Sequence, residues 1–247
     1  MQGWLFKEVG PPNISILEAQ EPIATTSDST IKMKLHLIRL ADLDSKHFHI
    51  PAYKSFPNTS LRPTHPLFVY RSAFHAPSSS TSLNKAVSSS EFASAVEQHL
   101  RDVGVVKPAW RYTMYSQHHY HSTTDEVLVV TSLTGARLCF GGAGRETFKD
   151  AVEVDVAQGD VIIVPAGVGH ALLHEQLTPL EEQEGQGFQM VGSYPVGATN
   201  WDMCTSGDAG DEALVADRWK RIQGLTWFPK DPAYGSAVTP AMEECTP

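Results

Sequence analysis

The sequence predicts an all-β domain whose short antiparallel strands form a closed barrel or a sandwich. Apolar and polar residues alternate at residues 136–140 and 152–156, which is the pattern of half-buried strands. The dipeptides Gly141-Gly142 and Gly159-Asp160 come soon after these stretches and are typical of tight turns. Regular short strands separated by glycine turns characterise sandwiches and barrels, so we expect this architecture from residue 110 to residue 194.

The residues that precede residue 110 predict several different kinds of local structure. Residues 1–30 are rich in polar residues and turn formers, and we expect them to form an arm over the barrel. Residues 31–37 alternate between apolar and polar and predict a half-buried strand. Residues 51–66 indicate an extended loop, residues 67–70 a buried strand, and the serine-rich residues 78–90 a linker.

A helix is predicted directly after the linker. Ser88 and Glu91 have the spacing of a capping box, and Gly104 suits the C-terminal cap. An apolar stripe at helical spacing runs between these caps and comprises Phe92, Val96 and Leu100. We expect the helix to pack on the outside of the barrel.

One domain accounts for the length of the chain. A chain of 247 residues with 41% hydrophobic content can bury a substantial core. We expect an N-terminal extension with strands, linker and helix over residues 1–105, the barrel core over 106–204, and a C-terminal tail that packs on the barrel over 205–247.

The most informative motif is a pair of histidines separated by one residue. Side chains alternate between the faces of a strand, so His119 and His121 point to one side while His118 and Tyr120 point to the other. We therefore treat His119 and His121 as candidate metal ligands, and His118 and Tyr120 as core or interface residues.

Two further ligands follow in the chain. Glu126 precedes the apolar residues 127–130, and a short hairpin would bring its carboxylate opposite the two histidines. His170 begins another predicted strand after the turn residues 165–167. Three imidazoles and one carboxylate suit a divalent transition metal, with Fe, Mn, Ni, Cu and Zn all compatible, and would leave coordination positions open for water, O2 or substrate.

A second pair with the same spacing, His47 and His49, has no matching carboxylate downstream. The short pattern therefore does not predict a metal site by itself. The first set does, because its ligands, turn residues and strand pattern agree with one another.

The two histidine segments resemble the paired motifs of the cupin superfamily. His119, His121 and Glu126 fit the first motif, and the segment 159–170, with its glycines, proline and final histidine, fits the second. Three positions depart from the motifs, and none of them is a candidate metal ligand: Thr113 and Leu133 replace glycines, and His174 replaces an asparagine. Over roughly residues 56–237, further strings such as Trp110-Arg111 are similar to the single-domain, YjlB-like group of cupins. The resemblance implies a jelly-roll barrel with one metal and a homodimer, but no particular reaction.

Four other residues are candidates for chemistry near the metal. A regular strand leading to His119 would place Arg111, Tyr115 and Gln117 on its face. Tyr115 and Gln117 could then hydrogen-bond a substrate or O2, whereas Arg111 is either a clamp for a carboxylate or a structural ion-pair partner. His174 lies four residues beyond His170 and is either an acid, base or hydrogen-bond donor beside the metal, or a structural histidine of the barrel.

Three functions are compatible with these features. The favoured one is a metal-dependent enzyme that acts on a small organic metabolite, an Fe(II) oxygenase or dioxygenase. The second is a decarboxylase, isomerase or lyase that uses the metal as a Lewis acid. The third is a binding module in which metal or ligand only stabilises the barrel.

Composition limits the partners. A net charge of −9 argues against a surface for nucleic acid or anionic membranes. The predicted metal pocket favours a small-molecule substrate, and the resemblance to cupins implies a second copy of the chain as partner. The first residues lack the cationic start and apolar centre of a signal peptide, and the three cysteines are few and far apart. Both observations favour reduced thiols in a cytoplasmic protein.

Overall fold

The computed structural model describes residues 35–76, 87–143, 149–177, 187–237 and 239–243. The predicted arm (1–30), the first part of the strand predicted at 31–37, most of the predicted linker (78–90) and Cys245 lie outside these residues. None of the helices in the described ranges combines the length and apolar character needed to cross a bilayer.

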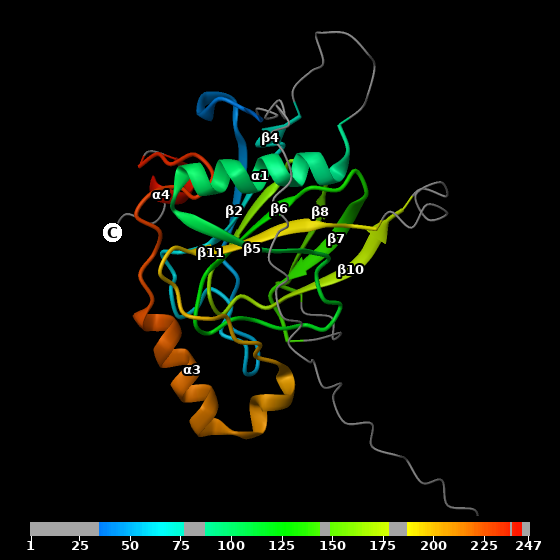
Figure 1. The fold of residues 1–247 in the computed structure, drawn as a ribbon. Coiled ribbons are helices and arrows are strands. Elements are labelled where there is room, and N and C mark those ends of the chain that lie inside the picture. Colours follow the sequence, from blue (N-terminus) through cyan, green and yellow to red (C-terminus); the bar gives the residue numbers. More distant parts are fainter. Residues whose placement is uncertain (1–34, 77–86, 144–148, 178–186, 238, 244–247) are drawn as a thin grey trace, which may run out of the picture. The chain divides into compact units, whose positions relative to one another are not determined.

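The described strands form antiparallel sheets (Figure 1). A six-stranded sheet has the order β2-β3-β9-β6-β11-β5, a three-stranded sheet has the order β10-β7-β8, and β1 pairs with β4. The strands of the large sheet are β2 (Asp44–Phe48), β3 (Leu67–Arg71), β5 (Val106–Tyr112), β6 (Glu126–Val130), β9 (Val161–Val164) and β11 (Met190–Pro195). The others are β1 (His36–Leu37), β4 (Phe74–His75), β7 (Gly135–Phe140), β8 (Val152–Val156) and β10 (His170–Gln176). This arrangement confirms the all-β jelly-roll expectation.

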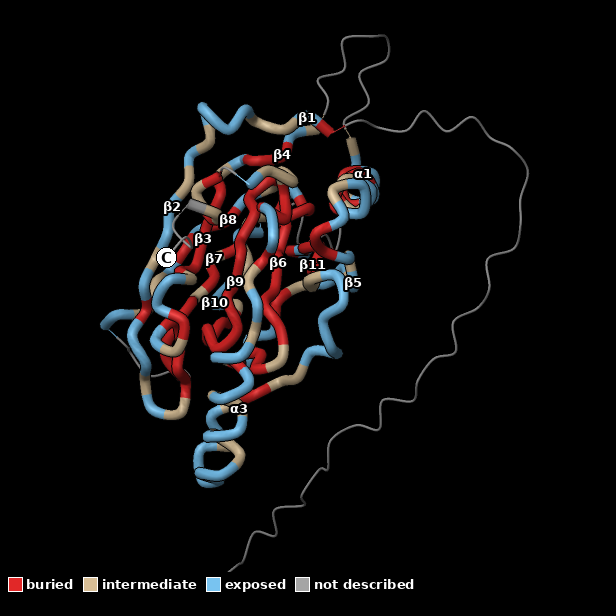
Figure 2. Tube along the Cα trace, turned by 90° about the vertical axis from the view of Figure 1, so that its left-hand side faces the viewer, coloured by how far each residue is buried: buried red, intermediate tan, exposed pale blue. Residues whose placement is uncertain are grey.

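Both faces of the six-stranded sheet are buried at its central strands β3, β9 and β6. Leu128 and Val130 of β6 share a core with Leu138 and Phe140 of β7, so the two larger sheets pack face to face. Val127 and Val129 point to the opposite face, where they share a second core with the helix α1. Strand β6 is therefore buried along its whole length (Figure 2), which explains its unbroken apolar sequence.

Helix α1 (Ser89–Val103) covers the outer face of the large sheet (Figure 1). Ser88 and Glu91 form the predicted capping box, and Gly104 ends the helix with a φ of 72°, in the left-handed region that glycine adopts without strain. The buried stripe of the helix includes Phe92, Val96 and Leu100, as predicted. The helix holds the sheet from outside and leaves the inner face for the site.

The large sheet draws strands from beyond the range 106–204. Strand β3 pairs with β9 in the interior of the sheet, and β2 pairs with β3 at its edge. Strands β2 and β3 therefore belong to the same sheet as β6, which begins at Glu126, and the strand pairing crosses residue 105. The predicted buried strand at 67–70 is confirmed as β3.

The C-terminal segment is attached to β3 by a buried carboxylate. One oxygen of Asp231 accepts hydrogen bonds from the hydroxyls of Tyr70 (2.7 Å) and Thr239 (2.8 Å), and the other accepts from the backbone N–H groups of Ala233 and Tyr234. The helical elements outside the sheets are η1 (Leu40–Asp42), η2 (Ser206–Gly210), α3 (Glu212–Gly224) and α4 (Pro240–Glu243).

Candidate metal centre

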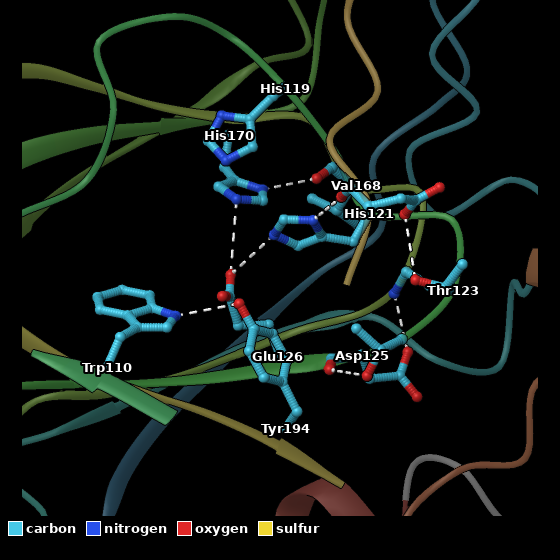
Figure 3. A network of polar contacts seen from close by, with 12 residues as sticks. Trp110, His119, His121, Thr123, Asp125, Glu126, Val168, His170 and Tyr194 are labelled. Carbon is cyan, nitrogen blue, oxygen red and sulfur yellow. Dashed lines mark hydrogen bonds and ion pairs between the residues drawn. The ribbon is translucent and has the colours of Figure 1, made fainter. Parts of the chain in front are cut away.

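Three histidines converge inside the barrel. His119, His121 and His170 are buried, and one ring nitrogen of each lies within 4.8 Å of the others (Figure 3). His170 is the first residue of β10, and its backbone pairs with His119 in an isolated antiparallel bridge. This bridge brings the two halves of the motif together across 51 residues of chain (170 − 119).

Each ring is oriented by a backbone carbonyl. The Nδ1 atoms of His119 and His170 lie 2.8 Å from Gln117 O and 2.9 Å from Val168 O, and Nδ1 of His121 contacts the carbonyl oxygen of Asp202. A carbonyl can only accept, so each Nδ1 carries the proton and each Nε2 is left with a free lone pair. Hydrogen bonding of the second ring nitrogen is the usual way in which proteins orient metal-binding imidazoles.

A buried carboxylate completes the cluster. Oε2 of Glu126, the first residue of β6, lies 3.6 Å from Nε2 of both His121 and His170 (Figure 3). Imidazole lone pairs and a carboxylate that face one another are all acceptors, and burying them together is costly without a cation between them. This donor set fits a divalent transition metal, and His119, His121, His170 and Glu126 are the residues that would hold it.

The protonation preferences of the histidines differ. Burial holds the pKa of His170 well below its usual value and also lowers that of His119. Burial would lower the pKa of His121 as well, but the Glu126 carboxylate and the contacts with Asp202 together outweigh burial and raise that pKa. Without a metal, a proton on the cluster is therefore most favourable at His121, beside Glu126.

A cavity of about 430 Å³ opens above these ligands, within the range typical of small-molecule sites. Besides the four candidate ligands, its lining includes Trp110, Tyr112, Tyr115, Tyr194 and Trp201. The indole N–H of Trp110 donates to the Tyr194 hydroxyl at 3.0 Å, and this pair approaches Glu126 from the side opposite the histidines (Figure 3). Burial and the neighbouring Glu126 carboxylate raise the pKa of Tyr194, so its hydroxyl stays protonated and can donate to that carboxylate.

The four residues predicted to take part in chemistry near the metal differ in whether they reach the cavity. Tyr115 lines the cavity, and its ring meets that of His119 edge-on at 5.6 Å between centroids. Gln117 is exposed and contributes only its carbonyl, to His119. Arg111 borders the cavity, but its guanidinium is held by Glu97 of α1 at Nε. Its ion-pair alternative is therefore the one that the geometry supports.

The expected regular strand does not reach the histidines. Strand β5 ends at Tyr112, and residues 113–118 are irregular, so the prediction of simple alternation from Arg111 to His119 was wrong. His174 is likewise exposed on β10 and is not brought to the centre, because a β-bulge between Leu172 and His174 breaks the alternation that would have placed it on the face of His170. His118 and Tyr120 pack against Phe56, away from the ligands, as expected.

Two supporting groups had no signal in the sequence. Asp202, in the loop after β11, orients His121 through its carbonyl and accepts hydrogen bonds from the backbone N–H and hydroxyl of Ser122 through its carboxylate. Asp125 accepts from Arg62 at 2.5 Å and from the backbone N–H of Ala166 at 2.8 Å. The second set ties the residue before Glu126 to the turn that leads to His170.

The geometry and the motifs resemble those of one known class of protein. The two histidine motifs meet at one centre of the jelly roll, where an isolated antiparallel bridge joins His119 to His170, and this is the arrangement expected of a cupin. The chain is also 30% identical over 127 residues to the uncharacterized protein YjlB of Bacillus subtilis (strain 168), a match that covers 51% of this chain and 64% of YjlB. The fold and the paired motifs are thus similar to those of cupins. The match with YjlB spans less than two thirds of that relative.

Other comparisons add little. No family model matches the chain. Among solved structures, RmlC from Streptococcus suis in complex with dTDP-D-xylose is 10% identical, with 81% of this chain and 89% of RmlC covered and a TM-score of 0.32. Acireductone dioxygenase from Bacillus anthracis with a cadmium ion in its active center is 18% identical, with coverage of 46% and 67% and a TM-score of 0.26. At such low TM-scores these likenesses carry no weight for the activity of this chain.

Proposed function

We propose that the chain is a metal-dependent enzyme that acts on a small organic molecule, and that it is an Fe(II) oxygenase. The observation that carries the proposal is the convergence of ring nitrogens of His119, His121 and His170 with the Glu126 carboxylate at one end of a 430 Å³ cavity. Iron accepts this mixture of imidazole and carboxylate ligands, and when bound it would supply the capacity to activate O2 next to a substrate.

The residues of the chain hold the candidate ligands in place and line the cavity. The three carbonyl contacts fix the ring orientations before any ligand arrives, which lowers the cost of assembling the centre. Tyr194 and Trp110 restrict the Glu126 carboxylate from the opposite side. Tyr115 and Tyr194 place hydroxyl groups at the cavity wall, where they can hydrogen-bond a substrate oxygen.

Elemental analysis of the purified protein tests the metal assignment. We expect about one equivalent of divalent transition metal per chain in the wild type and in His49→Ala, because His49 belongs to the histidine pair outside the centre. His121→Ala should lose most of the metal. Full occupancy in His121→Ala would contradict the ligand assignment, and an absence of metal in the wild type after loading under anaerobic conditions would contradict the metal site itself.

Oxygen uptake tests the reaction class. The Fe(II)-loaded protein is incubated with a panel of small metabolites in an oxygen electrode, and products are followed by mass spectrometry with and without O2. Product formation that consumes O2 and stops in its absence is expected. Turnover that continues unchanged without O2 would instead establish the non-redox alternative, in which the metal acts as a Lewis acid. A tightly bound compound that is recovered unmodified would favour the binding module.

We also propose that the chain forms a homodimer. Strand β2 stands at one end of the six-stranded order, and an edge strand can pair with a second chain. Light scattering coupled to size-exclusion chromatography should give twice the chain mass of 27.0 kDa. A mass of one chain at micromolar concentration would contradict the proposal.

A further inference from the structure

Aromatic side chains gather at the mouth of the metal cavity. Three of the exposed large apolar side chains among the described residues line this one cavity: Tyr112 (59% exposed), Tyr115 (49%) and Trp201 (43%). Trp110 and Tyr194 continue the aromatic wall inward. Aromatic rings contribute large apolar surface, and a contiguous exposed group of them usually marks a binding site.

The rings border the metal ligands on two sides. Tyr115 lies 5.6 Å from the ring of His119, and Tyr112 lies 6.5 Å beyond Tyr115. On the other side, Trp201 lies 5.6 Å from the ring of His121, from the loop that follows β11. A molecule that reaches the centre between these rings would therefore present its faces to aromatic surfaces.

The residues that line the cavity include few charged side chains that a ligand could bind. Of the described residues around the cavity, Arg111 is the single cation and Glu126 the single carboxylate. The Arg111 guanidinium already pairs with Glu97 and donates to the Ser94 hydroxyl at 2.9 Å, both on α1. A substrate carboxylate or phosphate would thus find no free basic side chain among these residues. Apart from the candidate ligands, the remaining polar side-chain groups are the hydroxyls of tyrosine and threonine and the indole N–H groups of Trp110 and Trp201.

We propose that the substrate of this site is a flat aromatic molecule that carries an oxygen donor for the metal and is otherwise uncharged. Stacking and edge contacts with Tyr112, Tyr115 and Trp201 supply recognition, and the tyrosine hydroxyls orient polar substituents. The oxygen-donor part of this assignment rests on the proposed function, whereas the aromatic preference rests on the cavity wall alone.

Two bidentate oxygen donors test the assignment in the metal-loaded protein. Catechol and oxalate both chelate through two oxygens, but only catechol has a ring. Binding is measured by calorimetry on protein loaded with Zn²⁺, which has no redox chemistry. We expect Tyr115→Ala and Trp201→Ala each to weaken catechol binding about tenfold while oxalate binding stays within about twofold, since ring contacts of this kind commonly change affinity by such factors.

The matched control is Leu133→Ala, which removes an exposed apolar side chain (61% exposed) that does not line the cavity. It should bind both probes as the wild type does. Equal losses for catechol and oxalate in the two aromatic variants, or no loss for either probe, would overturn the assignment.

A metal-free arm separates this inference from the proposed function. Phenol and cyclohexanol, which share a hydroxyl and a similar size, are compared by saturation-transfer NMR on chelator-treated protein. Phenol should give the stronger signal, and Trp201→Ala should reduce it at least threefold. Equal signals from both probes would refute the aromatic preference. Zinc analysis of the calorimetry samples reports on the metal site independently. If the protein binds no zinc but still prefers phenol, the proposed function is contradicted and the aromatic preference is not.

Discussion

The ion pair between Arg62 and Asp125 offers a quantitative test of how the site is supported. Their side chains are 5% and 1% exposed, and Arg62 Nη1 lies 2.5 Å from Asp125 Oδ1. The same oxygen accepts the backbone N–H of Ala166 at 2.8 Å. Replacement Asp125→Ala leaves a buried guanidinium whose other described contact is the ring of Trp227, 5.4 Å away, and removes the acceptor of Ala166.

Breaking a buried pair by removing one partner costs about 3–5 kcal/mol, chiefly because the other charge remains buried without compensation. We therefore expect Asp125→Ala to lower the free energy of unfolding by about 3–5 kcal/mol, which corresponds to a urea midpoint lower by on the order of 1–2 M. Equilibrium urea unfolding, followed by tryptophan fluorescence with chelator present, measures this loss separately from any loss of metal.

The double variant Arg62→Met/Asp125→Leu provides the control. It removes both charges and keeps apolar volume, so it should recover roughly 2 kcal/mol or more relative to Asp125→Ala. Recovery should be incomplete, because the N–H of Ala166 still lacks its acceptor. A loss below about 1 kcal/mol in Asp125→Ala, or a double variant no more stable than the single one, would refute the reasoning.

Three further predictions concern the site and its surroundings. His121→Ala should remove most bound metal and His118→Ala little of it, since only the first ring faces the centre; elemental analysis with equal losses would contradict this. Gly192→Ala should cost about 1–3 kcal/mol in urea unfolding, because an added Cβ would lie 2.0 Å from the Trp110 indole; wild-type stability would be inconsistent with that contact. Burial, with Arg62 nearby, lowers the pKa of His65 to about 4, so the neutral ring stabilises the fold above about pH 6.5 and this contribution is lost as the pH falls toward 4. Because the His65 ring is only half-buried and solvent screens its charge, His65→Phe should reduce the stability difference between pH 7 and pH 5 by about 1 kcal/mol or less, and an unchanged difference would count against the assignment.

Local sequence patterns were sufficient to predict the strands and helix named below and the set of candidate metal ligands. Alternation over 136–140 and 152–156 predicted β7 and β8, and the caps at Ser88 and Gly104 predicted α1 within a residue. These predictions succeeded because periodicity and capping depend on residues a few positions apart. The same holds for His119 and His121, whose shared direction follows from their separation by one residue.

Long-range contacts decided which of the other candidates reach the centre. Arg111 was a plausible clamp by alternation, but strand β5 ends at Tyr112 and Glu97 of α1 holds the guanidinium. His174 had the spacing to join His170, but the bulge after Leu172 displaces it. A bulge and an ion pair between distant segments leave no periodic trace, so neither was visible before the strands were paired.

By itself, the sequence determined the strand and helix pattern, the cupin motifs and the candidate ligands, because extended backbone and helix caps impose short, regular spacings. Only the tertiary structure decided how those ligands are oriented and what lies around them. The carbonyl of Asp202 meets His121 across 81 residues, Arg62 meets Asp125 across 63, and Tyr115 and Trp201 meet at one cavity from separate segments. These contacts depend on which strands pair and in which register, and packing of the whole barrel selects that register.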